Sequence, residues 1–288
     1  MWRGISLHDE VLKMVNQGLK CGEVHSVFNR TINMMTENGH MVSLMAKTMD
    51  NAPVSILADM DDFCDCGVFP GERVYFSKDK VTVGAKVIDT SRATGYKLDR
   101  GTYHADIPLL LKNLDTLRRL MDSNGPKAKY CFDTMAFQMV VHRTALLKQA
   151  FIEEDWGEVI KRGKSLMGLG QGLTPSGDDV IMGVFLSVGL LNSPVNRCHS
   201  LLSFIIGNMS DKTTDVSYQG LLRASEGFYR SILTEAAEAM TSTWDTADIL
   251  LKVLSIGHSS GRDLLYGIQT GYEIIMEKEK GNADQDYY

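Results

Sequence analysis

The spacing of apolar and polar residues divides the chain into two parts with different periodicities. From about residue 21 to 99, short apolar runs alternate with clusters of Gly, Pro, Asn and Asp, which is typical of strands joined by turns. Strands this short and this closely spaced predict a small antiparallel sheet or a barrel. The runs that predict strands are Val24–Phe28, Met41–Ala46, Val54–Leu57, Arg73–Phe76 and Val81–Ile88.

From His104 onward the apolar residues recur with the 3.6-residue period of a helix. The segments that predict helices are Leu109–Met121, Met135–Phe151, Trp156–Met167, Val180–Leu191, Leu201–Met209, Leu221–Met240, Ala247–Leu254 and Leu264–Met276. The pattern therefore predicts an α+β protein, with a β-rich domain over residues 1–103 and an all-helical domain over 104–288. Residues 5–17 also have helical spacing, and the polar segment Glu277–Tyr288 predicts a frayed end.

Composition narrows the class of protein. The 288 residues are 44% hydrophobic and 23% charged, as in a globular protein, and the net charge of −6 with no basic stripe disfavours binding to a phosphate backbone. The longest apolar runs fall short of the roughly 20 residues that span a bilayer, and the N-terminus lacks the apolar core of a signal peptide. Five cysteines, an odd number, fit a reducing compartment. We therefore expect a cytoplasmic protein.

One motif occurs twice in the helical part. The segment Ser176-Gly177-Asp178-Asp179-Val180-Ile181-Met182-Gly183 is matched 84 positions later by Ser260-Gly261-Arg262-Asp263-Leu264-Leu265-Tyr266-Gly267. In each copy the aspartate at the fourth position, Asp179 or Asp263, lies four residues before a glycine and so on the same helical face. A glycine there allows another helix to approach beside the carboxylate, which would justify its cost of about 1 kcal/mol relative to alanine. The repeat predicts two helix N-termini of one design that face a common site.

The loop before the first copy is suited to a ligand. Gly168, Gly170 and Gly172 allow a positive φ and close backbone approach, and Thr174 and Ser176 supply hydroxyl groups. Free N–H groups after Gly177 would point into the loop, together with the positive end of the helix dipole. Asp178 and Asp179 complement that dipole but repel a bare phosphate unless a cation intervenes. The alternative is that the two aspartates are surface residues that only pair with the dipole.

Two further loops carry polar residues at helix starts. His258, Ser259 and Ser260 precede the second copy, and His258 is either a proton-transfer group or an ordinary loop histidine. Thr213, Thr214 and Ser217 form a third cluster, in which one threonine predicts an N-cap. No nucleophile elbow, Walker motif or paired zinc-ligand motif occurs, and the glycines at 168–172 follow a helical rather than a strand pattern, which excludes a Rossmann fingerprint.

Taken together, three motifs resemble a bacterial family whose characterised members are AllH-type subunits of oxamate carbamoyltransferase. The motifs are Gly170-x-Gly-Leu-Thr-Pro-Ser-Gly-Asp-Asp179, Thr213-Thr214-x-x-Ser217 and Gly257-His-Ser-Ser-Gly-x-Asp263, in this order. Pro53–Leu57 and Gly71–Val87 resemble the β-rich N-terminal half of the same family. The resemblance thus covers most of the chain.

The resemblance implies a reaction and partners. An AllH-like subunit acts with FdrA-like and AllG-like subunits in a hetero-oligomer that interconverts oxalurate plus phosphate with oxamate plus carbamoyl phosphate, in allantoin and purine catabolism. It implies Asp178, Asp179, His258 and Asp263 as catalytic candidates, with Gly170, Gly172, Thr174, Ser176, Gly177, Thr213, Thr214, Ser217, Ser259 and Ser260 binding a small anionic substrate. Hydroxyl groups and helix N-termini suit phosphate or carboxylate, and the aspartates suit a carbamoyl NH₂ or Mg²⁺.

The chain departs from other carbamoyltransferases in having no arginine cluster, since only Arg223 and Arg262 lie near the motifs. Part of the site is therefore expected from a partner subunit. Two alternatives stay open. One is a non-catalytic assembly or regulatory subunit that binds a small anionic ligand, and the other is a stand-alone enzyme acting on another carbamoyl or amide compound.

Overall fold

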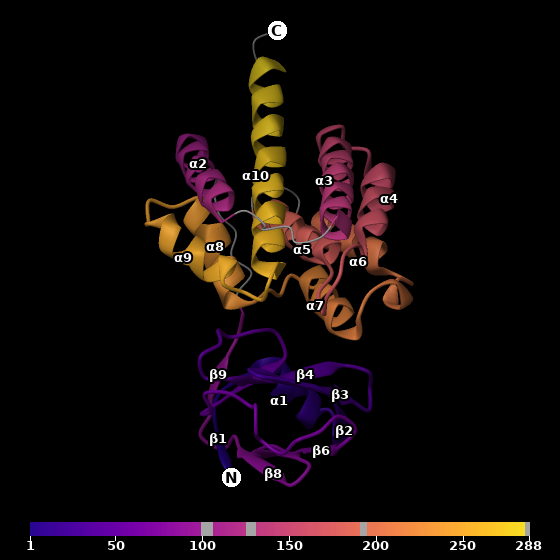
Figure 1. The fold of residues 1–288 in the computed structure, drawn as a ribbon, viewed down its shortest axis with the longest axis vertical. Coiled ribbons are helices and arrows are strands. Elements are labelled where there is room, and N and C mark those ends of the chain that lie inside the picture. Colours follow the sequence, from indigo (N-terminus) through magenta and orange to yellow (C-terminus); the bar gives the residue numbers. More distant parts are fainter. Residues whose placement is uncertain (99–105, 125–130, 191–194, 286–288) are drawn as a thin grey trace. The chain divides into compact units, whose positions relative to one another are not determined.

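The computed structural model describes residues 1–98, 106–124, 131–190 and 195–285. The chain divides into two compact units, residues 1–99 and 100–288 (Figure 1). This order, a β-rich unit followed by a helical one, confirms the predicted fold class. The domain boundary predicted between residues 103 and 104 lies outside the described residues.

The first unit is a barrel of mixed strand direction. Eight strands close a ring in the order β5-β4-β3-β2-β6-β7-β8-β1, with β1 pairing back to β5, and β9 adds to β1 beside β8. The elements are β1 (Trp2–His8), α1 (Asp9–Asn16), β2 (Cys21–Phe28), β3 (Thr31–Thr36), β4 (Met41–Ala46), β5 (Ser55–Ala58), β6 (Arg73–Phe76), β7 (Lys80–Val83), β8 (Lys86–Asp89) and β9 (Thr94–Tyr96). The alternative prediction of a small antiparallel sheet is wrong, because β4–β5, β1–β8 and β1–β9 are parallel pairs.

Alternation of side chains explains why the barrel forms. Ile32 and Met34 of β3 and Val42 and Leu44 of β4 are fully buried, and they alternate with residues of the opposite face. The predicted strand over Val81–Ile88 is instead two strands, β7 and β8, that turn at Gly84, which has a φ of +53°.

The helix predicted over residues 5–17 is correct only in its second half. Residues up to His8 form β1, because this segment has strand partners on both of its edges. His8 then caps α1, its Nδ1 atom accepting the Glu10 N–H at 3.3 Å. Tertiary pairing therefore overrides the helical spacing of Leu7 with Val11.

The second unit is helical throughout its described residues. The elements are α2 (Ile107–Ser123), α3 (Cys131–Ile152), α4 (Trp156–Leu166), α5 (Ser176–Leu190), α6 (Val195–Ile206), the 3₁₀ turn η1 (Ser210–Lys212), α7 (Asp215–Ser225), α8 (Ser231–Met240), α9 (Thr246–Leu254) and α10 (Ser260–Gln285). In Figure 1, α10 runs through the middle of this unit, with α2, α8 and α9 on one side and α3, α4 and α6 on the other. None of the described helices is long and apolar enough to cross a membrane.

Several helix boundaries differ from the prediction, and two of the differences change the architecture. The helix expected over Leu221–Met240 is divided into α7 and α8 at Gly227, whose φ of +83° ends α7. The segment from Glu277 onward was expected to be frayed, but α10 continues to Gln285. Tyr272 holds α10 in the core, since it is 1% exposed and donates its hydroxyl to the Ala237 carbonyl at 2.6 Å.

Candidate functional site

The two copies of the repeated motif begin the helices α5 and α10, which pack directly against each other. A Cβ atom on Gly183 would lie 2.3 Å from the Leu264 carbonyl oxygen, and one on Gly267 would lie 2.3 Å from the Val180 carbonyl oxygen. Each carbonyl belongs to the residue three positions before the other glycine. The contacts are therefore reciprocal, which gives the pair an approximate two-fold relation.

The same contacts fix the direction of the two helices. Gly183 meets Gly267, and one turn later Gly271 meets Ser187, where a Cβ would lie 2.6 Å from the serine Cβ. Contacts that advance together along both helices mean that α5 and α10 run parallel, with both N-termini at one end. The prediction that glycine allows close helix approach beside each aspartate is confirmed. Two positive dipole ends lie side by side there, which favours negative charge at this position.

The loops that lead into the two helices are also alike. The N–H of Gly177 donates to the Leu169 carbonyl at 2.8 Å, and the N–H of Gly261 donates to the Ile256 carbonyl at 3.0 Å. A Cβ on either glycine would lie 2.0 or 1.9 Å from a carbonyl oxygen of the preceding helix. These N–H groups are therefore occupied by the chain itself. The N–H of Gly177 is thus not among the free N–H groups expected at the start of α5.

Asp178 ties the first loop to α7. Its side chain is 1% exposed and accepts three hydrogen bonds, from the Gly168 N–H at 2.7 Å, from the Ser217 hydroxyl at 2.6 Å and from the Thr213 hydroxyl. Gly168 has a φ of +69°, and a Cβ there would overlap the Lys212 carbonyl at 1.7 Å. Asp178 thus holds the loop, η1 and α7 together with its hydrogen-bonding capacity largely used.

Thr214 is the N-cap of α7, as the sequence indicated for one of the two threonines. Its hydroxyl accepts the Ser217 N–H at 3.1 Å and donates to the Leu173 carbonyl. Gly170 has a φ of +116° and lies against Ser176, whose nitrogen would be 2.8 Å from an added Cβ. Gly172, with a φ of +101°, is exposed and has no close contact of this kind.

Asp179 connects the first copy of the motif to the second. Thr174 Oγ1 donates to Asp179 Oδ2 at 3.0 Å and lies 2.7 Å from Ser260 Oγ at the start of α10. Asp179 is 4% exposed, whereas Thr174 and Ser260 are half-buried. The motifs at α5, α7 and α10 are therefore in contact through Asp178 on one side and Asp179 on the other.

Asp263 occupies the equivalent position on α10. It is 5% exposed, and the Ser176 and Ser259 hydroxyl groups interact with its carboxylate, so each aspartate faces the N-terminal serine of the other helix. Its Oδ2 atom has no hydrogen-bond partner among the described residues. A buried carboxylate oxygen without a partner is rare in a folded protein and marks a candidate ligand contact.

Burial sets the protonation of this pair. Burial raises the pKa of Asp179 well above its usual value, the hydroxyl groups of Ser260 and Thr174 oppose the rise, and the charges of Asp263 and Asp178 add to it. Burial also raises the pKa of Asp263, but Ser176, Arg262 and Ser259 oppose the rise. The positive charge of Arg262 thus favours the charged form of Asp263, whereas the interactions that shift the pKa of Asp179 include no cation. Of the two carboxyl groups, Asp179 is therefore the one whose environment favours the protonated form more strongly.

His258 and Ser259 lie in the exposed loop before α10. His258 occupies the position equivalent to Thr174 but has no hydrogen-bond partner among the described residues. On the α5 side, residues 171–173 are also exposed, with Leu173 at 41%. The polar cluster between the helix ends is therefore bordered by two exposed loops.

The two nearby arginines have structural partners. Arg262 Nη1 donates to the carbonyls of Met121 and Asn124 at the end of α2, at 3.0 Å each, and Arg223 Nη1 donates to Glu226 at 2.7 Å. No group of three or more His, Cys, Asp or Glu side chains that could hold a metal ion occurs in the described part of the chain. The backbone carbonyls of Leu169 and Ile256, which accept the Gly177 and Gly261 N–H groups, could not be predicted because no side chain marks them.

Two family models match this chain. The model described as oxamate carbamoyltransferase subunit AllH matches residues 166–272, and the AllH family N-terminal domain matches residues 3–95. The chain belongs to the AllH family. It is accordingly a subunit of oxamate carbamoyltransferase, a transferase, and a subunit implies partner subunits. The first match spans α5, α7 and the start of α10, and so includes all three motifs. No solved structure matches the chain.

Proposed function

We propose that this AllH-family subunit contributes carbamoyl-transfer groups where the N-termini of α5 and α10 meet, with Asp179 as the reacting carboxyl group and Asp263 facing the same site. The observation that carries the proposal is the reciprocal placement of two buried carboxyl groups across a parallel helix pair, between exposed loops. Buried carboxyl groups with raised pKa values are typical of catalytic positions.

The proposed chemistry is reversible phosphorolysis of oxalurate. An oxygen of phosphate bonds to the carbamoyl carbon, and the bond from that carbon to the amide nitrogen breaks. The departing nitrogen requires a proton to leave as oxamate. Protonated Asp179 is the donor, and in the reverse direction its carboxylate accepts a proton from the oxamate amide. Thr174 and Ser260 orient Asp179, because the Thr174 hydroxyl donates to the Asp179 carboxyl group and the Ser260 hydroxyl interacts with both.

The other candidates take supporting roles in this proposal. Gly170, Ser176, Gly177 and Ser259 shape the two helix starts, and the exposed His258 is a secondary candidate for proton exchange with solvent. Thr213, Thr214 and Ser217 hold Asp178 and the first loop in place. Asp178 then positions its neighbour Asp179 rather than contacting substrate.

We further propose that FdrA-like and AllG-like subunits complete the site, in the cytoplasm and in allantoin catabolism. The engagement of Arg262 and Arg223 with other groups of the chain supports a need for partners, because oxamate, oxalurate and phosphate are anions. Basic groups for these anions would come from the other subunits. The odd number of cysteines supports the cytoplasmic assignment.

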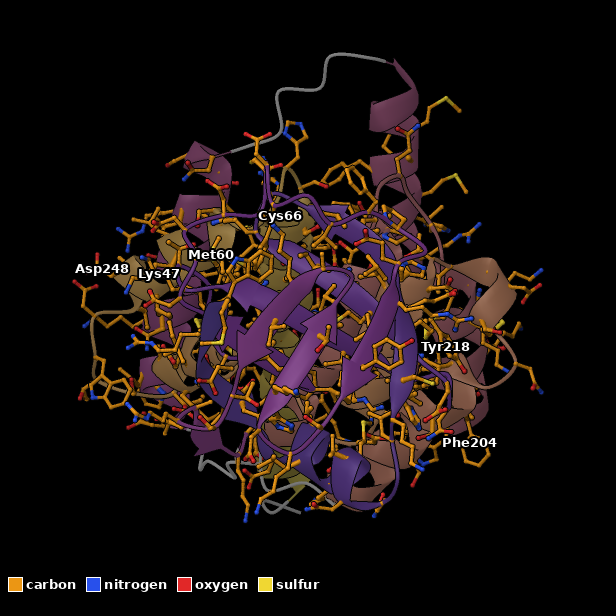
Figure 2. The ribbon with its side chains drawn as sticks, turned by 90° about the horizontal axis from the view of Figure 1, so that it is seen from below. Lys47, Met60, Cys66, Phe204, Tyr218 and Asp248 are labelled. Atoms are coloured by element: carbon orange, nitrogen blue, oxygen red, sulfur yellow. The ribbon has the colours of Figure 1, made fainter. Side chains whose placement is uncertain are left out.

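The test is reconstitution of the three-subunit complex and measurement of carbamoyl phosphate formed from oxalurate and phosphate. Asp179→Asn should lower turnover by at least about 100-fold, the usual effect of removing a proton donor. Asp248→Asn is the matched control, since Asp248 is an exposed aspartate in the first turn of α9 and extends outward at the edge of Figure 2. Its turnover should equal that of the wild type.

The competing hypothesis is an assembly or regulatory subunit that binds a small anionic ligand. The dense hydrogen bonding of Asp178 favours it, because such a network stabilises a fold without requiring a reaction. Under this hypothesis Asp179→Asn retains turnover in an assembled complex. That result would end the proposal that Asp179 reacts.

A further inference from the structure

Asp263 differs from its counterpart Asp179 in one respect that the proposed proton transfer leaves unused. Asp179 Oδ2 accepts the hydroxyl of Thr174 at 3.0 Å, whereas Asp263 Oδ2 has no partner among the described residues although the residue is only 5% exposed. His258 replaces Thr174 at the equivalent loop position, and its side chain is exposed. The Ser176 and Ser259 hydroxyls interact with the Asp263 carboxylate, but Oδ2 of Asp263 lacks the hydroxyl donor that Thr174 gives to Oδ2 of Asp179.

An unpartnered carboxylate oxygen at this depth requires a hydrogen-bond donor. Arg262 does not supply one, because its Nη1 atom donates to the carbonyls of Met121 and Asn124. A divalent cation would need more oxygen ligands than this pair of carboxyl groups provides, and no acidic group of three gathers in the described residues. A neutral N–H donor on a ligand fits both the burial and the single free acceptor.

We propose that Asp263 Oδ2 accepts a hydrogen bond from the NH₂ of the transferred carbamoyl group and so selects carbamoyl over acyl substrates of the same shape. This inference rests on the proposed function, because it places the carbamoyl group between the two helix starts. Asp179 then handles the proton of the amide nitrogen, while Asp263 recognises the terminal nitrogen. A methyl group in place of NH₂ would leave Oδ2 buried and unpartnered, which is the usual basis for strong rejection of an analogue.

Acetyl phosphate provides the probe, since it carries a methyl group where carbamoyl phosphate carries NH₂. In the reconstituted complex, running in the direction that forms oxalurate, the Michaelis constant of carbamoyl phosphate and the inhibition constant of acetyl phosphate are measured. In the wild type we expect the inhibition constant of acetyl phosphate to exceed the Michaelis constant of carbamoyl phosphate by a ratio of at least about 10, as for one hydrogen bond to a charged group. Asp263→Leu, which removes both oxygens, should bring this ratio close to one by weakening carbamoyl phosphate, while acetyl phosphate changes by less than about two-fold.

Asp263→Asn keeps the shape of the side chain and one acceptor oxygen. It replaces Asp263→Leu in the test if that variant does not assemble. Its expected ratio lies between the wild-type ratio and a ratio of one. A ratio unchanged from wild type in an assembled Asp263 variant overturns the inference. If Asp179→Asn is inactive at the same time, only the role of Asp263 is wrong. If Asp179→Asn is fully active, the proposed site itself is wrong, and this inference falls with it.

Discussion

Two acidic side chains of α10, Glu273 and Asp263, have opposite surroundings. In the middle of the helix, Glu273 accepts hydrogen bonds from Arg118 at 2.8 Å, Lys148 at 2.9 Å and Gln269 at 2.9 Å. Although burial alone raises the pKa of Glu273, these donors hold the pKa below its usual value. At the start of the helix, Asp263 is buried with an unpartnered oxygen and a raised pKa.

Glu273 and Asp263 therefore differ in how much their interactions contribute to stability. Glu273 joins α10 to α2 through Arg118 and to α3 through Lys148, so its charge is used to fix helix positions. Arg262 is next to Asp263 in sequence and its charge opposes the rise of the Asp263 pKa, but its Nη1 atom donates to carbonyls at the end of α2. A buried carboxylate oxygen without a hydrogen-bond donor costs stability, which supports the proposal that Asp263 serves the site rather than the fold.

Asp178 sharpens the comparison, because it is next to Asp179 in sequence but resembles Glu273 in being well paired. Asp178→Ala should lower the free energy of unfolding by about 2–4 kcal/mol, since it leaves the Gly168 N–H and the Ser217 and Thr213 hydroxyls without their acceptor. Denaturant unfolding of the isolated chain measures the loss, with Asp248→Ala as the exposed control. A loss below 0.5 kcal/mol, or about the scatter of surface substitutions, would mean that the network adds little.

Much of the barrel and helix content could be predicted from the sequence, and the failures have physical causes. The runs at Met41–Ala46 and Arg73–Phe76 match β4 and β6, because their bounds are set by local pattern. Residues 31–36 were missed as β3, because the polar residues Thr31, Asn33 and Thr36 leave no continuous apolar run there. Residues 2–8 were missed because their strand identity depends on distant partners.

The site was predictable in its parts but not in its connections. The repeat indicated two similar helix starts, and Gly183 and Gly267 indicated a close helix contact, both of which the structure contains. The exchange of partners, with Asp179 near Ser260 and Asp263 near Ser176, follows from the parallel direction of α5 and α10. Local sequence patterns do not encode that direction, because it depends on the packing of the helices between the two copies.

Glu273→Gln tests the stabilising side of the comparison. The variant leaves Arg118 and Lys148 without a countercharge, and we expect unfolding to be easier by about 1–3 kcal/mol at neutral pH, below the value for a fully buried pair. Since the pKa of Glu273 is lowered on folding, its contribution is complete above the unfolded pKa and is lost as pH falls through the folded one. The difference between variant and wild type should therefore shrink in acid.

If the difference in unfolding free energy between Glu273→Gln and wild type did not shrink at low pH, an electrostatic role for Glu273 would be contradicted. Glu153→Gln is a suitable control, because Glu153 is an exposed glutamate that accepts one hydrogen bond from Gln149. Its effect should stay within the range of about 0.5 kcal/mol that is common for surface substitutions.

Asp179→Asn gives the smallest expected change in stability and the opposite sign. The pKa of Asp179 rises on folding, so the folded chain binds more protons than the unfolded chain between the unfolded pKa and the higher folded one. Stability contributed by this group is thus present in acid and is lost as pH rises from about 4 through the folded pKa. Asparagine keeps the shape and does not ionise, so we expect the variant to equal wild type in acid and to exceed it by roughly 0.5–2 kcal/mol near neutral pH. Denaturant unfolding across this pH range measures the difference. A variant that is less stable than wild type at neutral pH would show that Asp179, like Glu273 and Asp178, is placed for stability, and the contrast between these well-bonded carboxylates and the aspartates at the starts of α5 and α10 would be lost.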